Sequence, residues 1–187
     1  MATITFAPAT WARPPEALLR DPLAFLAAEH TRQRRLCDTL LAADPAAAIG
    51  PADARALIEL LTCDLALHVI DEEEDLFPLL RRRRLPEDEI ETVLGELSGE
   101  HADEQKIAGE IVAGLRHALD KGWATTAVAG LHEHLRGLAR IERSHLARED
   151  AVVLPIARRR LGPGDRADLG QRMAARRGID LDLGAAP

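Results

Sequence analysis

An eleven-residue pattern occurs twice in this chain and constrains its fold more than any other feature. In each copy a histidine is followed by a glutamate four positions later and by a proline after a further six, over residues 68–78 and 145–155. A Glu-His pair precedes each copy, at Glu29-His30 and Glu100-His101. Such an internal repeat predicts two similar structural units packed against each other. The repeated residues are also of the types that bind metal ions.

The composition indicates one helical domain. The chain has 187 residues, which is enough for a single sizeable core. Tyrosine is absent and aromatic residues make up only 3%, which disfavours a β-sandwich. The net charge of −7 argues against general nucleic-acid binding. The basic run Arg81–Arg84 is better explained by the attraction of cations to a helix C-terminus.

The cysteine count and the hydropathy pattern predict a cytoplasmic protein without a membrane partner. Two cysteines, Cys37 and Cys63, are too few for a disulfide framework, and no signal peptide is recognised. No apolar run approaches the ~20 residues needed to cross a bilayer.

Periodicity and capping signals predict four long helices, over residues 21–43, 52–83, 87–119 and 124–161. The first should begin at Asp21-Pro22, an N-cap followed by proline. Pro78 should kink the second. Short connections then predict an all-α fold, an up-down-up-down four-helix bundle made of two helix pairs.

The two ends of the chain are expected to add to this bundle, which would span residues 21–161. Residues 1–20 should form an irregular N-terminal arm, held to the body by Trp11. Residues 162–187 should form a short C-terminal helix and a loosely held tail, with Asp165 capping that helix and Arg177 near its end.

The spacing of the repeated residues predicts a metal site inside the bundle. Positions i and i+4 share one face of a helix, so His68 and Glu72 point to one place, as do His145 and Glu149. Both pairs fall on the apolar stripes that face the core. Buried glutamates without partners would destabilise the fold, and bound cations would remove that cost.

Symmetry divides the candidate ligands between two ions. His30 and His68 would hold one ion, His101 and His145 the other, and Glu72 and Glu149 would bridge them. Nitrogen-rich, carboxylate-bridged ligation suits iron, with manganese and zinc as alternatives. A ferritin-like site would need two Glu-x-x-His motifs, and only Glu142 and His145 have that spacing.

With these residues in place, the chain resembles the hemerythrin-like family, also called the HHE cation-binding domain, over roughly residues 21–161. The matching residues lie on four successive predicted helices: His30, His68 with Glu72, His101, and His145 with Glu149. The resemblance implies a non-haem di-iron centre, with two ions joined by an oxo or hydroxo bridge. It also implies O2, NO or peroxide as ligands.

Two positions matter for the comparison with the oxygen-carrying members of that family. Those proteins have a second histidine four residues after the third-helix ligand, where this chain has Gln105. They also place an aspartate five residues after the last histidine, where this chain has Asp150. The repeat favours Glu149 over Asp150 as the bridge. With four histidines, both ions would keep an open position, which favours sensing or redox reactivity over reversible oxygen carriage.

Other polar residues near the predicted site are expected to assist it or to lie in solvent. Glu104, Gln33 and Asp64 are candidates for auxiliary ligation or support. The three residues that follow Glu72 are expected to form a solvated acidic face: Glu73, Glu74 and Asp75.

Three classes of function remain open from the sequence. The first is a protein that binds or senses a small oxidant, and the second is an enzyme that turns over peroxide or NO or oxidises ferrous iron. The family also includes proteins that repair iron–sulfur centres by supplying iron, often with an N-terminal cysteine-bearing domain. The third class is a metal-free helical interaction module. No protein partner is indicated.

Overall fold

The computed structural model describes residues 2–181, and its regular secondary structure is helical. Within that range the one isolated backbone bridge joins Thr3 and Ala48, and no strand is formed. This confirms the all-α prediction. None of the described helices is both long and apolar enough to cross a lipid bilayer. The part of the predicted tail beyond residue 181 lies outside the described residues.

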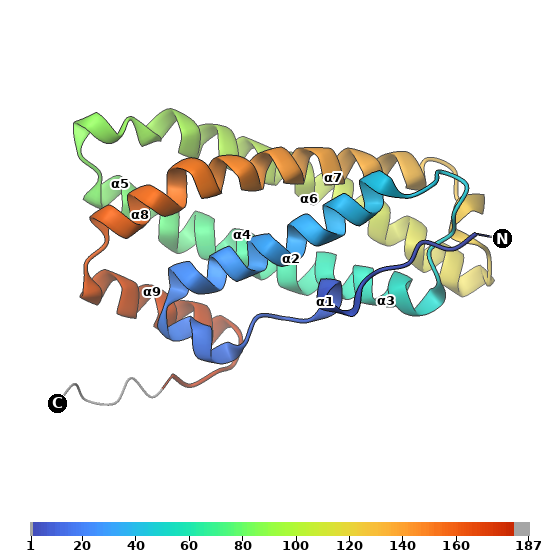
Figure 1. Ribbon diagram of the computed structural model, residues 1–187, viewed down its shortest axis with the longest axis horizontal. Helices are drawn as coiled ribbons and strands as arrows, with labels where there is room; N and C mark the ends of the chain where they lie inside the picture. Colours follow the sequence, from blue (N-terminus) through green and yellow to red (C-terminus); the bar gives the residue numbers. More distant parts are fainter. Residues whose placement is uncertain (1, 182–187) are drawn as a thin grey trace.

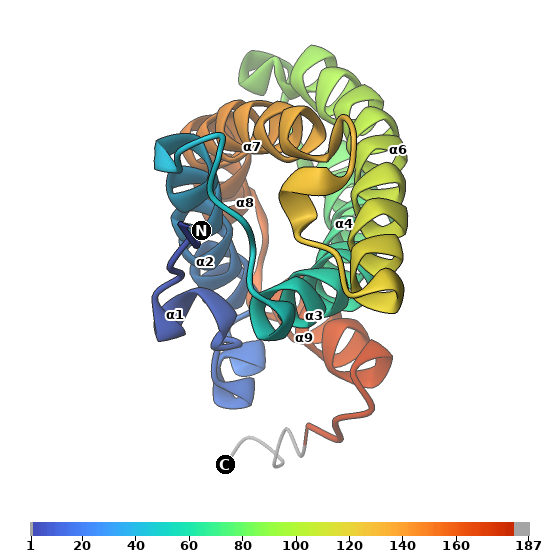
Figure 2. The ribbon, with the colours of Figure 1, turned by 90° about the vertical axis from the view of Figure 1, so that its right-hand side faces the viewer.

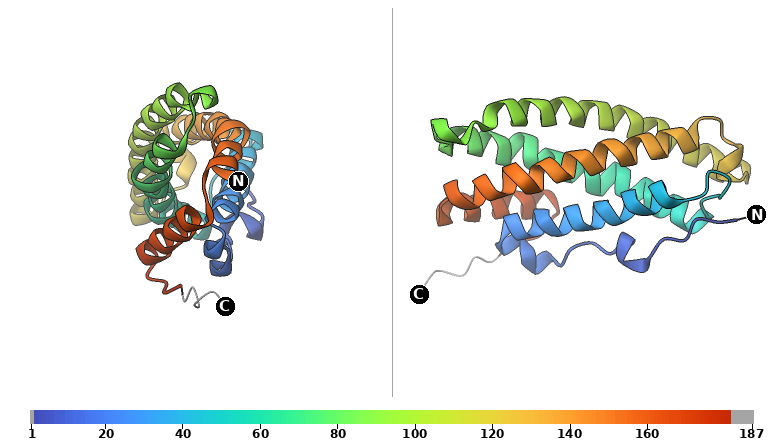
Figure 3. Two further views of the ribbon diagram at one scale, coloured as in Figure 1. Left: turned by 90° about the vertical axis from the view of Figure 1, so that its left-hand side faces the viewer. Right: turned by 45° about the horizontal axis from the view of Figure 1, so that its top comes forward.

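Four helical runs lie side by side and form the body of the molecule (Figure 1 and Figure 3). Each run is one helix or a series of helices joined end to end: α2 (Pro22–Ala42); α3, α4 and α5 (Pro51–Glu59, Leu65–Ile70 and Phe77–Arg83); α6 (Ile90–Lys121); and α7 with α8 (Leu131–Arg148 and Leu154–Arg160). Viewed along the bundle, they surround a common centre, and α9 (Pro163–Arg176) lies outside them (Figure 2).

Wider π-helical turns join the segments of the second and fourth runs. They span Leu60–Asp64, Asp71–Leu76 and Glu149–Val153. The second and third of these end just before the helices that contain Pro78 and Pro155. Proline has no N–H and clashes with the preceding turn, so the helix widens there. The irregularity expected at Pro78 therefore occurs as a π-helical turn, and its equivalent follows in the second repeat.

Two of the long helices begin later than predicted. A 3₁₀ turn at Pro86–Asp88 and a left-handed Glu89, with φ of 47°, precede α6. Before α7 the chain forms a 3₁₀ turn at Thr125–Ala127 and then turns at Gly130, whose φ of 76° suits a residue without a Cβ.

The C-terminal helix α9 also differs from its prediction in how it is capped. Asp165 lies inside the first turn of α9 and accepts a hydrogen bond from the Gly162 N–H at 3.2 Å. It does not stand before the helix as its N-cap, so that part of the prediction was wrong. The presence of the helix was correct.

The N-terminal arm packs against the body. It contains α1 (Pro8–Trp11) and a 3₁₀ turn at Glu16–Arg20, and the side chains of Ile4 and Phe6 are buried. The Trp11 Nε1–H donates to Asp53 Oδ1 at 3.0 Å. Trp11 therefore holds the arm in place, as expected.

Two hydrophobic clusters fill the bundle, with a polar layer between them. Along α2, Leu26 belongs to one cluster and Leu36 to the other. Along α6, Leu97 belongs to the same cluster as Leu26, and Ala108 belongs to the same cluster as Leu36. The buried histidines of these two helices lie between the clusters, in the middle of the bundle. The fold therefore encloses its charged residues between two apolar cores.

Candidate metal centre

The structure brings the six predicted residues together in the middle of the bundle. They form two overlapping groups of four, and the ligand atoms of each group all lie within 4.8 Å of one another. One group contains His30 and His68, and the other contains His101 and His145. Glu72 and Glu149 belong to both groups, which is the arrangement expected of bridging carboxylates.

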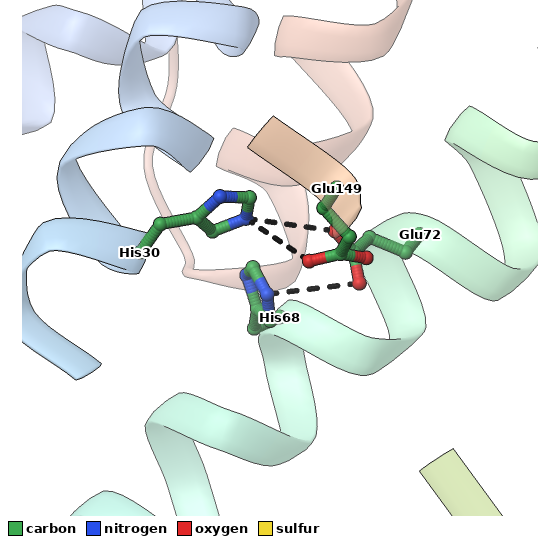
Figure 4. Close-up of side chains that lie close together, drawn as sticks. All are labelled: His30, His68, Glu72 and Glu149. Carbon is green, nitrogen blue, oxygen red and sulfur yellow. Dashed lines mark ion pairs between the residues drawn. The ribbon is translucent and has the colours of Figure 1, made fainter. Parts of the chain in front are cut away.

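The side chains of the first group meet at their nitrogen and oxygen ends (Figure 4). His30 Nε2 lies 3.4 Å from Glu149 Oε2 and 3.8 Å from Glu72 Oε1. His68 Nε2 lies 3.6 Å from Glu72 Oε2, one helical turn along. Both imidazoles therefore direct Nε2 at Glu72, and His30 Nε2 also lies near Glu149.

The second group repeats this arrangement. His101 Nε2 lies 3.3 Å from Glu72 Oε2, and His145 Nε2 lies 3.2 Å from Glu149 Oε1. The His101 and His145 rings are 4.6 Å apart between centroids, close to the 5.2 Å between His30 and His68. The two halves are thus related by an approximate twofold symmetry.

Outward hydrogen bonds fix how each imidazole faces the centre. A carboxylate accepts from every Nδ1, at distances of 2.7 to 3.1 Å: Asp150 from His30, Glu29 from His68, Glu73 from His101, and Glu100 from His145. We call these four residues the outer carboxylates. Because an ionised carboxylate can only accept, each Nδ1 carries a hydrogen, and each Nε2 faces inward.

The inward-facing atoms have no hydrogen-bond partner in the described part of the chain. This holds for Nε2 of all four histidines, for Oε2 of Glu72 and for both carboxylate oxygens of Glu149. These side chains are at most 5% exposed. An unsatisfied buried polar atom costs about 1–3 kcal/mol. A cation at each group would give all of these atoms a partner, so the residues present fit two metal ions.

The electrostatics of the two central glutamates lead to the same conclusion. Burial raises the pKa of Glu72 well above its ordinary value, and the negative charge of Glu149 raises it further. Two carboxyl groups in one buried space resist ionising together. A cation between them would allow both to be ionised.

The outer carboxylates follow the repeat. Glu29 and Glu100 each precede a histidine of the centre, and each accepts from the other histidine of its own helix pair. Glu73 and Asp150 each follow a central glutamate and accept from a histidine of the opposite helix pair. Each helix pair therefore orients one histidine of its partner.

Two sequence predictions are corrected by these contacts. Glu73 is not part of a solvated face, because it holds His101. Asp75 is also buried, at 5% exposure, and pairs with Arg172 and Arg176 of α9. Glu74 is exposed, as expected. The repeated Glu-His pairs already marked Glu29 and Glu100, although the sequence alone assigned them no role.

Further side chains hold the outer carboxylates. Asp150 pairs with Arg34, and Glu100 pairs with Arg148. The Ser98 hydroxyl donates to Glu73 Oε2 at 2.9 Å, and Arg177 Nη2 lies 3.4 Å from Glu29 Oε1. Every histidine of the centre is thus oriented by a carboxylate that is itself restrained.

The candidate auxiliary residues lie outside the two groups. Asp64 binds Arg32 at 2.6 Å and Arg13 at 2.9 Å, so both of its oxygens are engaged elsewhere. Glu104 and Glu142 are buried and hydrogen-bonded to each other, with Glu104 Oε1 4.0 Å from His145 Nδ1. Burial, and next the charge of Glu142, raises the pKa of Glu104 to about 9. Glu104 therefore holds a proton beside the centre.

A cavity connects this centre with one side of the bundle. It has a volume of about 320 Å³ and lies between the second helical run and α6. His101, Glu104 and Gln105 line it, together with a mainly apolar wall: Leu61, Leu65, Val69, Ile70, Ala108 and Val112. A small molecule in this cavity would contact one histidine of the centre. Gln105 borders the same space.

Comparison with known proteins adds one finding. A family model described as the hemerythrin HHE cation-binding domain matches residues 21–157. This range contains all six central residues and all four outer carboxylates. Comparisons with curated proteins and with solved structures gave no match.

Proposed function

Since this chain belongs to the hemerythrin HHE cation-binding family, we propose that it is a di-iron protein that binds or senses a small oxidant at its buried histidines and glutamates. Hemerythrin-like domains bind metal ions, typically iron, and the two buried groups described above are able to hold metal. The proposal treats the four helical runs as an up-down-up-down bundle. It extends the family assignment to the number of ions and to the kind of ligand.

The observation that carries the proposal is the set of inward atoms without partners. Four imidazole nitrogens and three carboxylate oxygens face one another, and none of them has a hydrogen-bond partner in the described part of the chain. They divide into two groups that share Glu72 and Glu149. Two bridged ions account for this division, whereas a single ion would leave one histidine pair unpartnered. The nitrogen-rich donor set favours iron over magnesium or calcium, with manganese and zinc as alternatives.

The cavity between the second helical run and α6 favours a small uncharged ligand. Its wall is mainly apolar, and it opens onto His101, so charged or strongly hydrated molecules would lose solvation on entering. Iron in such a centre supplies redox chemistry toward O2, NO or peroxide. The residues of this chain would orient the metal ligands, exclude bulk water and limit the size of the entering molecule.

Glu104 and Glu142 favour a redox enzyme as the second candidate. Glu104 lines the cavity and hydrogen-bonds Glu142, and its pKa of about 9 keeps a proton at this position near neutral pH. Peroxide breakdown, NO turnover and ferrous oxidation all involve proton transfer. A proton held between two buried carboxyl groups next to the cavity suits such reactions.

The first experiment measures iron per chain after anaerobic reconstitution with ferrous iron, with the absorption spectrum recorded before and after air. We expect two irons per chain and near-ultraviolet bands of a bridged di-iron centre after oxidation. One metal ion per chain, or a preference for zinc, would contradict the di-iron proposal. Glu72→Ala and His145→Ala should lose iron, whereas the exposed Glu74→Ala should keep it.

A second measurement separates the two candidate functions. A binding or sensing protein should react once per centre with peroxide or NO. An enzyme should turn over many equivalents per centre under the same conditions, and Glu104→Gln should slow that turnover without lowering the iron content.

A further inference from the structure

The C-terminal helix α9 reaches toward the centre with two arginines. It follows the segment 21–157 that matches the family model, and it lies against α2 and the π-helical turn Asp71–Leu76, outside the four helical runs (Figure 2). Arg176 and Arg177, at its end, extend their side chains inward and are 21% and 12% exposed. The chain therefore brings to its centre two cations that the matched segment does not contain.

Arg177 contacts two carboxylates that adjoin the central residues. Its Nη1 lies 2.7 Å from Asp71 Oδ2, and Asp71 precedes Glu72 in the chain. Its Nη2 lies 3.4 Å from Glu29 Oε1, and the other oxygen of Glu29 accepts from His68 Nδ1 at 3.1 Å. A single carboxylate therefore separates the guanidinium from a histidine of the centre.

The guanidinium of Arg177 is itself held in place. Its Nη1 donates to the carbonyl oxygen of Met173 at 2.9 Å, and its Cζ lies over the Phe25 ring, 4.8 Å from the ring centroid. Arg176 Nη1 donates to Asp71 Oδ1 at 2.6 Å, so Asp71 has a second cation beside Arg177. The carbonyl oxygen, the ring and the carboxylates together fix the charge of Arg177 beside the outer carboxylate of His68.

The corresponding pair in the other half of the centre is more exposed to solvent. Glu100 accepts from His145 and pairs with Arg148, and the side chains of Glu100 and Arg148 are each 31% exposed. The exposed fractions are 6% for Glu29 and 12% for Arg177. Water and salt screen the first pair more strongly than the second. The approximate twofold symmetry of the centre is therefore broken at these two arginines.

We propose that Arg177 is a positioning residue of the centre, acting through Glu29 on His68. It makes the ion position at His68 electrostatically unlike the position at His145. A carboxylate that accepts from Nδ1 makes the imidazole a stronger donor to a metal ion, and a cation beside that carboxylate moderates the effect. A positive charge near a metal centre also favours its reduced state. Both effects raise the reduction potential of an ion held by His68, and this part of the inference rests on the proposed di-iron function.

The imidazole signals of the metal-free, full-length protein test the contact without iron. In Arg177→Gln, Glu29 no longer shares its negative charge with a guanidinium and accepts more strongly from His68. The Nδ1–H proton signal of His68 in the NMR spectrum should therefore move downfield, while the signal of His145 stays in place.

Two other arginines supply the controls. Arg172→Gln removes the same charge from α9, but Arg172 is 57% exposed and pairs with Asp75, which is not an outer carboxylate. This variant should move neither histidine signal. Arg148→Gln should move the signal of His145 and leave that of His68 unchanged.

The iron-loaded protein gives a second measurement. Arg177→Gln should keep two irons per chain and lower the midpoint potential of the centre. The one-electron equilibrium should shift about tenfold toward the oxidised centre, equivalent to ~59 mV. Arg172→Gln should keep the wild-type potential. A purely structural role of Arg177 would lower the stability of the protein and move neither the potential nor the His68 signal.

A second variant covers the case in which Arg177→Gln does not fold. Arg177→Lys keeps a charge for the buried Asp71 but lacks the planar fork that also reaches Glu29, so the His68 signal should move in the same direction by a smaller amount. An unmoved His68 signal in the folded variants would overturn the inference, whether or not the protein binds iron. Fewer than two irons in the wild type would instead overturn the di-iron proposal, and the His68 signal would still decide the role of Arg177.

Discussion

His30 and Asp150 lie 120 positions apart in the chain, and His30 Nδ1 is 2.8 Å from Asp150 Oδ1. The equivalent contact in the other half joins His101 Nδ1 and Glu73 Oε1 at 2.7 Å. In both cases the residue that follows a central glutamate orients a histidine of the opposite helix pair. The two pairs therefore depend on each other for the geometry of the centre.

Replacing Asp150 should weaken the centre without removing it. Asp150→Ala removes the acceptor that orients His30, and such partners of a ligating histidine are typically worth 10–100-fold in metal affinity. We expect a loss of that size in an iron competition titration, with two irons per chain still reached at saturation. Glu149→Ala should fail to reach two irons. Asp103→Asn, an exposed change on α6, serves as the control. Unchanged affinity in Asp150→Ala would refute the orienting role.

The stability of the metal-free protein should fall as pH rises. The pKa of Glu104 is about 9, against 4.5 for the ordinary group, because of its burial and then of the charge of Glu142. Between these values the folded state holds a proton that the unfolded state has released, so the free energy of unfolding decreases with pH. One such group contributes at most about 1.4 kcal/mol per pH unit.

Glu104→Gln removes this titration and keeps a donor for Glu142. Urea unfolding of chelator-treated protein between pH 5 and pH 9 should therefore show a shallower decline and a more stable variant at neutral pH. Asp103→Asn should leave the slope unchanged. An identical slope in wild type and Glu104→Gln would contradict the raised pKa.

Filling the access cavity should slow the reaction with air. Ala66 lines this cavity, and Ala66→Phe would place a ring in the path toward His101. The iron content should stay at two per chain while the rate of oxidation of the ferrous protein, followed by stopped-flow absorbance, falls about tenfold or more, equivalent to ~1.4 kcal/mol or more in the entry barrier. Ala113→Phe, on the exposed face of α6, is the matched control. Equal oxidation rates would place the entry route elsewhere.

Gly170 should be essential for the packing of α9. A Cβ at this position would lie 2.3 Å from the carbonyl oxygen of Leu19, a backbone atom that cannot move away cheaply. Gly170→Ala should lower the free energy of unfolding by about 1–3 kcal/mol. Gly164 lies on the same helix with no atom within 4 Å of such a Cβ, so Gly164→Ala should be neutral or stabilising. Thermal denaturation of the two variants compares them directly.

The six central residues could be predicted from the sequence because they depend on local spacing. Two residues four apart on a helix share a face, and this held for His68 with Glu72 even though a π-helical turn begins at Asp71. The family match confirms the resemblance that those residues carried. Their assignment as metal ligands stays a prediction.

The roles of Glu73 and Asp150 could not be predicted in the same way. In a regular helix the residue after an inward-facing glutamate lies on a different face of the helix. Helical periodicity therefore predicted that Glu73 is exposed to solvent. Both residues lie in π-helical turns, where that periodicity no longer applies. Their partners also lie on helices of the opposite pair, so the contacts depend on how the two pairs pack.

The start of α7 was missed for a different reason. Residues 124–130 contain no proline and read as a continuation of a helical pattern. The Thr125 hydroxyl instead accepts a buried hydrogen bond from the Ile49 N–H at 2.8 Å, which ties this segment to the loop before α3. A tertiary contact of this kind outweighs local helix propensity.

The crossed contacts of His30 with Asp150 and of His101 with Glu73 also bear on how quickly the protein comes apart. Neither helix pair carries a complete group of ligands, so the centre exists only while the pairs are docked. Cations held there would have to be released before the pairs could separate. The loaded protein should therefore persist because its unfolding is slow, while its rate of folding, set before the pairs meet, stays nearly that of the free chain.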